Sequence, residues 1–334
     1  MPETTYDVLG IGNAIVDVMA RIEDDFLVAE SLAKGTMHLI DAPRAETLHK
    51  AIPAAIERSG GSAGNTAAGV ASLGGRAAFI GKVANDALGA LYRGDMHRTG
   101  VPLRHRAPLP AGAPTARSMI LITPDGERTM NTYLGACQML TPDDIDATVV
   151  RAAAITYLEG YLWDPPLAKQ AFRRAAEIAH AAGRKVSLTL SDAFCVDRFR
   201  AEFKELIRSR TVDILFANDL ELKSLYTTSS LEAAVVAVRV DCALTAVTVG
   251  SDGALVVTPG AVVSVPATPV EAVVDLTGAG DLFASGFLYG AARGMDLADA
   301  ARLGTMAASE VIGHIGPRPA RPLSEVARSA GFAI

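Results

Sequence analysis

The sequence DLTGAGD, residues 275–281, lies between two different hydrophobic patterns. The apolar run that ends at Val274 is typical of a strand, and the apolar residues after the segment recur at helical spacing. The small residues are therefore expected in the first turn of a helix. Unpaired backbone N–H groups and the positive end of the helix dipole favour an anion there. Glycine also lets the backbone approach a phosphoryl group closely.

The last residue of this segment is a carboxylate, which would repel a bound phosphate. The conflict is removed if Asp281 faces an incoming hydroxyl group and accepts its proton, while the amides of Gly278, Ala279 and Gly280 hold the phosphoryl oxygens. The alternative is an ordinary capped helix that begins after a glycine turn. The segment alone is compatible with either a phosphoryl-transfer site or a helix cap.

Short apolar runs alternate with longer helical patterns on the N-terminal side of this segment. Strands are expected at Tyr6–Ile11, Ala77–Ile80, 154–158, 186–190, 212–216 and 246–249, and helices at 62–73, 87–99, 165–182, 198–209 and 231–238. This alternation implies right-handed crossovers and a mostly parallel sheet that is covered on both faces. Ligands bind beyond the carboxyl ends of the strands in such sheets. We therefore expect an α/β fold with its site at that edge.

Four further short strands depart from this alternation. They are expected at 19–22, 36–40, 116–123 and Arg128–Tyr133, and together they could form a small β-layer that serves as a lid. We expect one α/β domain over residues 1–334, with a lid lobe formed by about 18–42 and 101–135. A lid need not be completed by a neighbour, but exposed lid edges can pair. A monomer and a homodimer both remain open.

Composition excludes several classes of protein. The 334 residues contain 31 Lys and Arg against 37 Asp and Glu, a formal charge of -6, which argues against a nucleic-acid polymer as partner. Three dispersed cysteines without CxxC spacing indicate reduced thiols in a cytoplasmic protein, and the N-terminus shows no export signal. Prolines interrupt the uncharged stretch 253–270, so a hairpin is expected there and not a membrane span.

Three other glycine clusters are candidate ligand-binding loops. In residues 10–15 Ile15 replaces the third glycine of a dinucleotide fingerprint, which disfavours a nicotinamide dehydrogenase. Gly81-Lys82 lacks the other residues of a P-loop, and Lys82 is expected to be a strand-end lysine in solvent. The cluster GGSAGN, residues 60–65, suits a polyol, although a flexible loop entering a helix explains it equally well.

Taken together, these clusters resemble the ribokinase-like (PfkB) family of small-molecule kinases. Residues 60–65, continuing through Ala68, Gly74-Gly75, Ile80-Gly81, Asp86 and Gly89, are similar to its first signature, and 275–281 followed by ASGF, 284–287, to its second. NDLE, 218–221, and TVGSDG, 248–253, also match in order. The resemblance covers about residues 6 to 319. It implies a three-layer α/β/α fold with a mostly parallel central sheet and a small β-lid.

Family membership implies a role for each matching position. Asp281 would be the catalytic base, and the backbone of Gly278, Ala279 and Gly280 the anion hole. Asn218 and Glu221 would organise Mg²⁺ and its waters, and their alternative is a helix cap with an exposed acid. The residues expected to border ATP are Thr248, Gly250, Gly253 and Thr277. A monovalent cation, K⁺, is expected near Asp275.

Within the family, several segments resemble those of the adenosine kinases more than those of ribokinases: 10–13 with Asp17, 188–191 and 212–218. This resemblance implies a polar end for ribose and an apolar slot for the base. The expected substrate contacts are Asn13, Ile15, Asp17, Leu39, Gly61, Ser62, Asn65, Met130, Leu134, Tyr161 and Phe194. The slot residues, taken singly, are more often plain core. Tyr161-Leu162 stands where a phenylalanine pair is expected, and Met130 where a leucine is expected.

Arg128, after the turn at 124–126, is the natural cation to reach the transferring phosphoryl group when the lid closes, although a solvent-facing hairpin arginine is the alternative. Three functions follow. The first is transfer of the γ-phosphoryl group of MgATP to the 5′-hydroxyl of adenosine. The second is the same chemistry on a sugar such as ribose or fructose, or on another nucleoside. The third is a ligand-binding regulator that no longer catalyses transfer.

Overall fold

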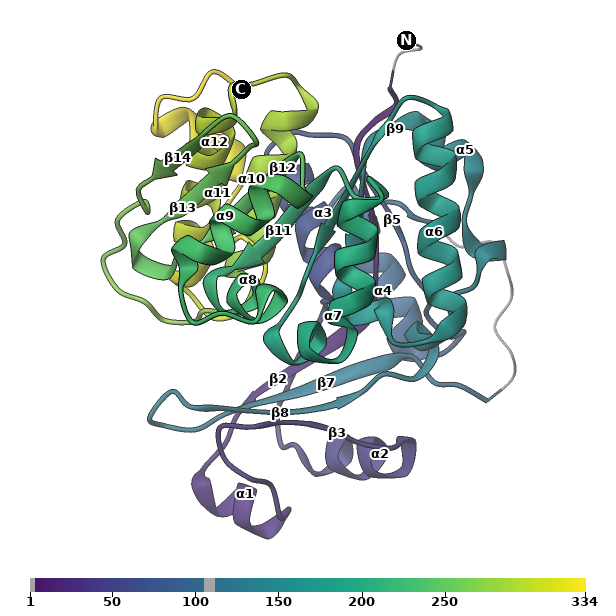
Figure 1. The fold of residues 1–334 in the computed structure, drawn as a ribbon. Coiled ribbons are helices and arrows are strands. Elements are labelled where there is room, and N and C mark those ends of the chain that lie inside the picture. Colours follow the sequence, from purple (N-terminus) through teal and green to yellow (C-terminus); the bar gives the residue numbers. More distant parts are fainter. Residues whose placement is uncertain (1–3, 105–111) are drawn as a thin grey trace.

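The computed structural model describes residues 4–104 and 112–334, and within them nine strands form the central sheet (Figure 1). In spatial order the strands are β14 (Val262–Val265), β13 (Ala254–Val257), β12 (Leu244–Thr248), β11 (Ile214–Asn218), β10 (Lys185–Thr189), β9 (Ala153–Glu159), β1 (Tyr6–Ile11), β5 (Ala77–Ile80) and β6 (Leu103–Arg104). Neighbours from β12 to β6 are parallel, whereas β13 and β14 are antiparallel. The expected mostly parallel sheet and the hairpin within 253–270 are confirmed.

Helices cover both faces of this sheet because neighbouring strand residues point to opposite sides. On one face lie α3 (Ser62–Ser72), α4 (Ala87–Arg98), α10 (Ala279–Ala292), α11 (Leu297–Ile312) and α12 (Leu323–Ser329). On the other lie α5 (Ala147–Ala152), α6 (Pro166–Ala181), α7 (Ala193–Arg208), α8 (Asp219–Tyr226) and α9 (Leu231–Asp241). Val8 enters the first core and Leu9 the second. The three-layer α/β/α architecture is thus confirmed.

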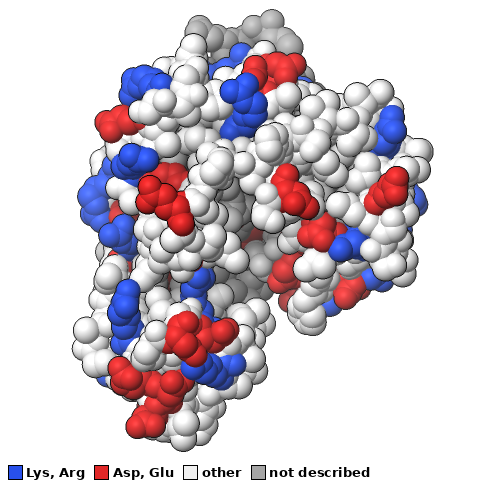
Figure 2. Space-filling view, turned by 90° about the vertical axis from the view of Figure 1, so that its left-hand side faces the viewer, with Lys and Arg blue, Asp and Glu red and all other residues white. Residues whose placement is uncertain are grey.

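A second sheet of five strands projects from the main body as a lid (Figure 1). Its spatial order is β3 (Met37–Leu39), β8 (Arg128–Tyr133), β7 (Ala116–Ile122), β2 (Ile15–Arg21) and β4 (Ile56–Ser59). Helices α1 (Asp24–Ala29) and α2 (Ala42–Ala51) belong to the same lobe. Figure 2 shows the face of the molecule hollowed between this lid and the main body.

The bounds of the lid differ from those expected at 18–42 and 101–135. Its strands come from 15–59 and 116–133, and Leu103–Arg104 belongs to the central sheet instead. Strand β4 was not predicted, because its sequence IERS has no alternation of apolar and polar residues. Three of its four side chains are exposed or partly exposed. Residues 105–111, inside the expected lobe, lie outside the described residues.

Two further expectations are wrong. Residues 266–276 form no strand that ends at Val274: the segment contains two prolines, and the amides of Val274 and Asp275 both point to the carbonyl of Ile312. Lys82 is not in solvent, because it is 2% exposed and its Nζ lies 2.9 Å from a carboxylate oxygen of Asp144. A buried ammonium is tolerated when it is paired in this way.

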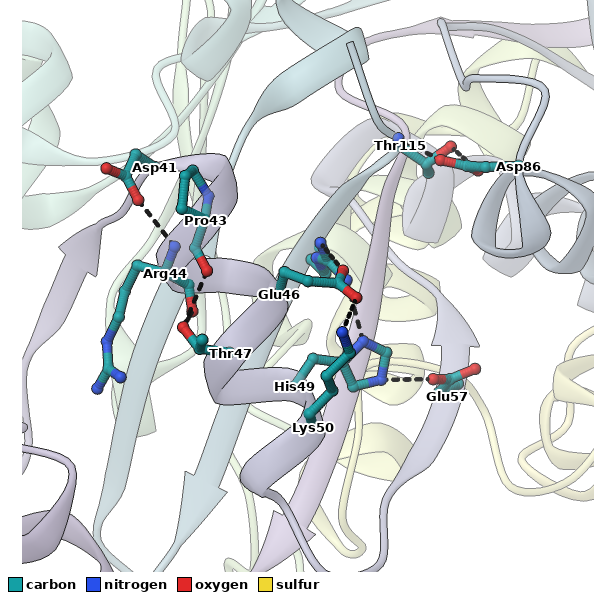
Figure 3. Close-up of polar contacts among 11 residues, drawn as sticks. Asp41, Pro43, Arg44, Glu46, Thr47, His49, Lys50, Glu57, Asp86 and Thr115 are labelled. Atoms are coloured by element: carbon teal, nitrogen blue, oxygen red, sulfur yellow. Dashed lines mark hydrogen bonds and ion pairs between the residues drawn. The ribbon is translucent and has the colours of Figure 1, made fainter. Parts of the chain in front are cut away.

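Polar contacts fix the lid to its own helix and to the main body (Figure 3). Asp86, which caps α4, accepts hydrogen bonds from the backbone N and Oγ1 of Thr115 at 2.8 and 2.6 Å, just before β7 begins. On the lid itself, Arg117 Nη1 donates to His49 Nδ1 at 3.1 Å, so Nε2 carries the proton shared with Glu57. The lid is therefore anchored where its strands leave the core.

Two properties bear on the class of protein. The three cysteines, Cys137, Cys195 and Cys242, are buried and free. Among the described residues, no helix has the length and apolar character needed to cross a bilayer.

Candidate active site

Parallel strands bring their carboxyl ends to the same edge of the central sheet, and a cavity of about 520 Å³ opens there. Glu159, Thr189, Asn218 and Thr248 each end one of four adjacent strands, and Asn13 follows β1. All five side chains line the cavity, and the lid strands form its opposite wall. The cavity thus lies in the hollow between lid and body.

Asp281 lies in the first turn of α10 and faces the start of α3. Its Oδ1 accepts a hydrogen bond from Ser62 Oγ at 2.6 Å, and its Oδ2 accepts one from Asn65 Nδ2 at 2.9 Å. Burial raises the pKa of Asp281 above its usual range, while these two hydrogen bonds and the charge of Arg318 oppose the rise. The result is an oriented carboxylate that binds a proton more readily than a free aspartate does.

The glycine turn before Asp281 begins α10 as expected. Gly278 has φ of +83°, a conformation that favours glycine, and a Cβ atom there would lie 2.8 Å from Pro317. The amide of Ala279 already donates to the carbonyl of Leu276 at 3.2 Å. Apart from its chain neighbours and the backbone of its own helix, no atom of the described residues lies within 4 Å of the place that a Cβ on Gly280 would take. The backbone at Gly280 is therefore open to an approaching anion.

Arg128 joins the lid to this turn. Its Nη2 lies 2.5 Å from Asp275 Oδ1, and its Nη1 donates to Thr277 Oγ1. Asp275, 3% exposed, also accepts hydrogen bonds from the amides of Thr277 and Gly316 at 2.6 and 2.9 Å. The alternative of a solvent-facing arginine is thus wrong, although Arg128 does not itself line the cavity. A monovalent cation near Asp275 stays a prediction.

Asp17 lies on lid strand β2 at the mouth of the GG loop. A Cβ atom on Gly60 would overlap its carboxylate, and one on Gly61, where φ is +86°, would overlap the carbonyl of Asn13. Both glycines are therefore needed for the close approach of lid and core. Burial raises the pKa of Asp17 to about 7, Arg318 opposes the rise, and Asp281 and Asp275 add to it.

Glu159, which the sequence did not single out, is buried at the floor of the cavity and 1% exposed. It accepts hydrogen bonds from Asn13 Nδ2 at 2.8 Å and from the amide of Ala63 at 2.9 Å. Burial raises its pKa to about 7, and the two donors oppose the rise. Its position at the end of β9 was the available signal, because acids at that edge of a parallel sheet can reach ligands.

Apolar side chains face the cavity from both sides and remain exposed. Leu39 on the lid is 63% exposed, and Phe194 and Tyr161 on the body are 67% and 42% exposed. Large exposed apolar groups around one cavity are typical of a binding site for a flat apolar ligand. All three are among the residues expected to form the apolar slot.

Asn218 and Glu221 form a reciprocal capping box at the start of α8. Asn218 Oδ1 accepts from the amide of Glu221 at 2.8 Å, and Glu221 Oε2 accepts from the amide of Asn218 at 3.0 Å. The alternative predicted an exposed acid at Glu221, which is wrong, because Glu221 is 5% exposed and lines the cavity. Burial raises the pKa of Glu221 to about 7. A buried carboxylate at a cavity wall suits a hydrated cation opposite it.

The cavity unites most of the residues expected from the sequence. All the expected substrate residues line it: Asn13, Ile15, Asp17, Leu39, Gly61, Ser62, Asn65, Met130, Leu134, Tyr161 and Phe194. So do Asn218, Glu221, Thr248, Thr277, Gly278, Ala279, Gly280 and Asp281. Gly250 and Gly253, in the turn after β12, do not line it, so their contact with ATP stays a prediction. Lining residues that the sequence did not single out include Ser118, Thr132, Gln138, Glu159 and Asp192.

The cavity is lined by a buried carboxylate in the first turn of a helix that begins after a glycine turn. This arrangement suits phosphoryl transfer, and the comparisons with known proteins agree with that chemistry. The model of the pfkB family of carbohydrate kinases matches residues 33–323. The chain belongs to this family. Its members are kinases that phosphorylate hydroxyl groups, with ATP as the donor in the relatives so named.

Individual relatives differ in the acceptor that they are named for. The chain is 55% identical to the structure of an adenosine kinase from Sinorhizobium meliloti, with a TM-score of 0.90 over 97% of this chain and 99% of that one. It is 54% identical to a probable sugar kinase from Rhizobium etli, with a TM-score of 0.91 over 98% and 99%. An ATP-dependent ribose-1-phosphate kinase from Halopiger xanaduensis is 33% identical over 70% of this chain and 73% of its own.

Proposed function

We propose that this PfkB-family kinase transfers the γ-phosphoryl group of ATP to the 5′-hydroxyl of adenosine. The observation that supports adenosine is that polar groups and exposed aromatic rings line the same cavity. Asp17 and Asn13 offer oxygens to a ribose, and Tyr161 and Phe194 offer exposed rings to a purine. A purine offers a flat aromatic surface for these rings to stack on, which a free sugar lacks. The likeness to the Sinorhizobium meliloti adenosine kinase supports the same acceptor.

The acceptor hydroxyl is bound between the floor of the cavity and Asp281. Asp17 carboxylate oxygens accept hydrogen bonds from ribose hydroxyls. Asp281, with its pKa raised by burial, accepts the proton of the attacking hydroxyl. Ser62 and Asn65 keep its two oxygens oriented toward that task.

The transferring group is held by the turn at the start of α10. The open backbone at Gly280 and the positive end of the helix dipole attract the phosphoryl oxygens. Arg128 adds its guanidinium from the lid, beside Thr277. The lid excludes water over the bound substrates, because hydrolysis of ATP is the competing reaction.

Mg²⁺ would neutralise phosphate charge and bind through phosphate oxygens and water. Asn218 and Glu221 would hold that water shell, since both line the cavity and carry oxygen ligands. In the described part of the chain no group of three His, Cys, Asp or Glu side chains could hold a metal ion by itself. A metal held largely by its substrate is in keeping with that donor set.

A sugar such as ribose or fructose, or another nucleoside, is the second candidate acceptor, and the likeness to the probable sugar kinase from Rhizobium etli favours a sugar. The experiment is a panel of nucleosides and sugars, each incubated with MgATP and the purified protein, with ADP release and product mass measured. Adenosine is expected to have the highest kcat/KM and to yield AMP. A higher kcat/KM for D-ribose or D-fructose would replace the proposal with the sugar kinase. We propose a cytoplasmic role in purine salvage on the same basis.

A further inference from the structure

Arg318, between α11 and α12, carries a buried charge and has no part in the phosphoryl transfer proposed above. It is 9% exposed, and its Nε and Nη2 donate to the carbonyl of Ser59 at 3.2 and 3.1 Å. Nη2 also lies 3.1 Å from Ser59 Oγ, whereas Nη1 is buried and has no partner among the described residues. Burying a guanidinium is unfavourable unless its contacts compensate. The hydrogen bonds to Ser59 are the contacts that compensate for burying this guanidinium.

Ser59 is the point where the chain passes from the lid into the core. It ends β4, and Gly60 and Gly61 lead on into α3. From the opposite side, Asp95 Oδ2 accepts hydrogen bonds from the amide and Oγ of Ser59 at 2.9 and 2.5 Å. Tyr92 Oη donates to the carbonyl of Gly60 at 3.2 Å. The crossing is thus held at its backbone from two separate elements of the core, α4 and the segment after α11.

The position of the crossing determines the position of Asp17. The carboxylate of Asp17 packs directly on Gly60, with no room for a Cβ atom between them. Arg318 also acts on Asp17 by its charge: burial raises the pKa of Asp17 to about 7, and Arg318 opposes this rise while Asp281 and Asp275 add to it. A displaced or neutral Asp17 would be a weaker acceptor for hydroxyl hydrogen bonds.

The segment that bears Arg318 also contacts the anion-binding turn. The amide of Gly316 donates to Asp275 Oδ2 at 2.9 Å, and Pro317 packs against Gly278. One short stretch, residues 316–318, therefore touches both the turn expected to hold the phosphoryl group and the loop on which the acceptor site rests. Arg318 contacts the loop at Ser59 without lining the cavity itself.

We propose that Arg318 is a positioning residue for the acceptor: it fixes the Ser59–Gly60 crossing from behind the cleft and so holds the Asp17 carboxylate in place. The proposal rests on the proposed function only in assigning acceptor hydroxyls to Asp17. It predicts that loss of Arg318 weakens binding of the acceptor and leaves binding of ATP unchanged. The groups that face Arg318 and share in this effect are Tyr92, Asp95, Asp17 and Asp281.

The test compares Arg318→Gln, Arg318→Lys and a control, Arg184→Gln. Arg184 is also 9% exposed and donates to a backbone carbonyl, that of Arg151, but it precedes β10 at the other end of the sheet. KM and kcat are measured for adenosine, for D-ribose and for ATP from pH 6 to 9. Arg318→Gln is expected to raise the KM of the acceptor about tenfold or more and to leave the KM of ATP unchanged. The acid limb of kcat/KM is expected to move to higher pH, because Asp17 loses a nearby positive charge.

Arg318→Lys separates charge from geometry. It keeps the charge and is expected to restore the acid limb, but a single ammonium cannot bond both oxygens of Ser59 as a fork does, so the KM of the acceptor recovers only in part. The proposal is overturned if Arg318→Gln matches Arg184→Gln in acceptor KM and pH profile. It is equally overturned if Arg318→Gln raises the KM of ATP as much as that of the acceptor.

A second measurement keeps this test separate from the identity of the acceptor. Wild-type turnover of D-ribose but not adenosine defeats the nucleoside proposal, and Arg318 is then judged with D-ribose. Amide hydrogen exchange of the peptide spanning residues 57–64 needs no substrate. Exchange there is expected to be faster in Arg318→Gln than in the wild type and in Arg184→Gln. Unchanged exchange would show that Arg318 does not hold the crossing.

Discussion

Arg128 Nη2 lies 2.5 Å from Asp275 Oδ1, so a residue of lid strand β8 is bound to the segment that opens the anion-binding turn. The same guanidinium donates to Thr277 Oγ1. Lid and turn are therefore in direct contact through this side chain. The planar fork of an arginine matches the oxygens of a phosphoryl group, and Thr277, which Arg128 contacts, lines the cavity.

The first prediction follows from this contact. Arg128→Gln is expected to lower kcat by roughly 10²-fold, the usual effect of removing one donor to a developing negative charge. Arg128→Lys is expected to recover only part of the loss, because a lysine lacks the planar fork. Steady-state kinetics with saturating ATP measure both. Arg44→Gln is the control, since Arg44 binds Glu30 within the lid and away from the turn. Equal kcat in Arg128→Gln and the control would exclude a role in transfer.

The second prediction concerns Asp281. Asp281→Asn is expected to bind adenosine and ATP with near wild-type dissociation constants, because an amide can still meet Ser62. Its kcat is expected to fall roughly 10²–10⁴-fold, the usual contribution of a general base. Calorimetric titration and single-turnover kinetics separate the two. Asp299→Asn, an acid on the surface of α11, serves as the control. Near-normal turnover of Asp281→Asn would remove it from the role of base.

The third prediction concerns the apolar slot. Phe194→Ala and Tyr161→Ala are each expected to raise the KM of adenosine about tenfold, because a ring stacked on a purine contributes on the order of 1 kcal/mol beyond its buried area. The KM of D-ribose should hardly change. Leu220→Ala is the control, because Leu220 is 60% exposed but lies outside the cavity. A parallel rise for both acceptors would mean that the rings do not contact a base.

Much of the fold was predictable because its strands are buried runs of apolar residues separated by helices of regular period. Strand β4 was not, because its sequence is largely polar, and the strand expected up to Val274 was wrong because its valines are exposed next to irregular backbone. The motif residues of the site also followed from sequence. Glu159 and Arg318 were not predicted, because their hydrogen-bond partners are distant in the sequence. Glu159 accepts from the amide of Ala63, and Arg318 donates to the carbonyl of Ser59.

The fourth prediction concerns the effect of Asp17 on the free energy of unfolding at different pH values. The pKa of Asp17 is about 7 in the folded protein against an ordinary 3.8, so between those values the folded state binds more protons than the unfolded state. Its free energy of unfolding therefore falls as pH rises from about 4 to 7. Asp17→Asn should be more stable than the wild type at pH 8, by on the order of 4 kcal/mol, with the gain shrinking toward pH 4. Urea unfolding at both pH values measures this, with exposed Asp25→Asn as control. A gain independent of pH would mean that Asp17 is not held in a buried, desolvated site, and its binding of hydroxyls would lose its physical basis.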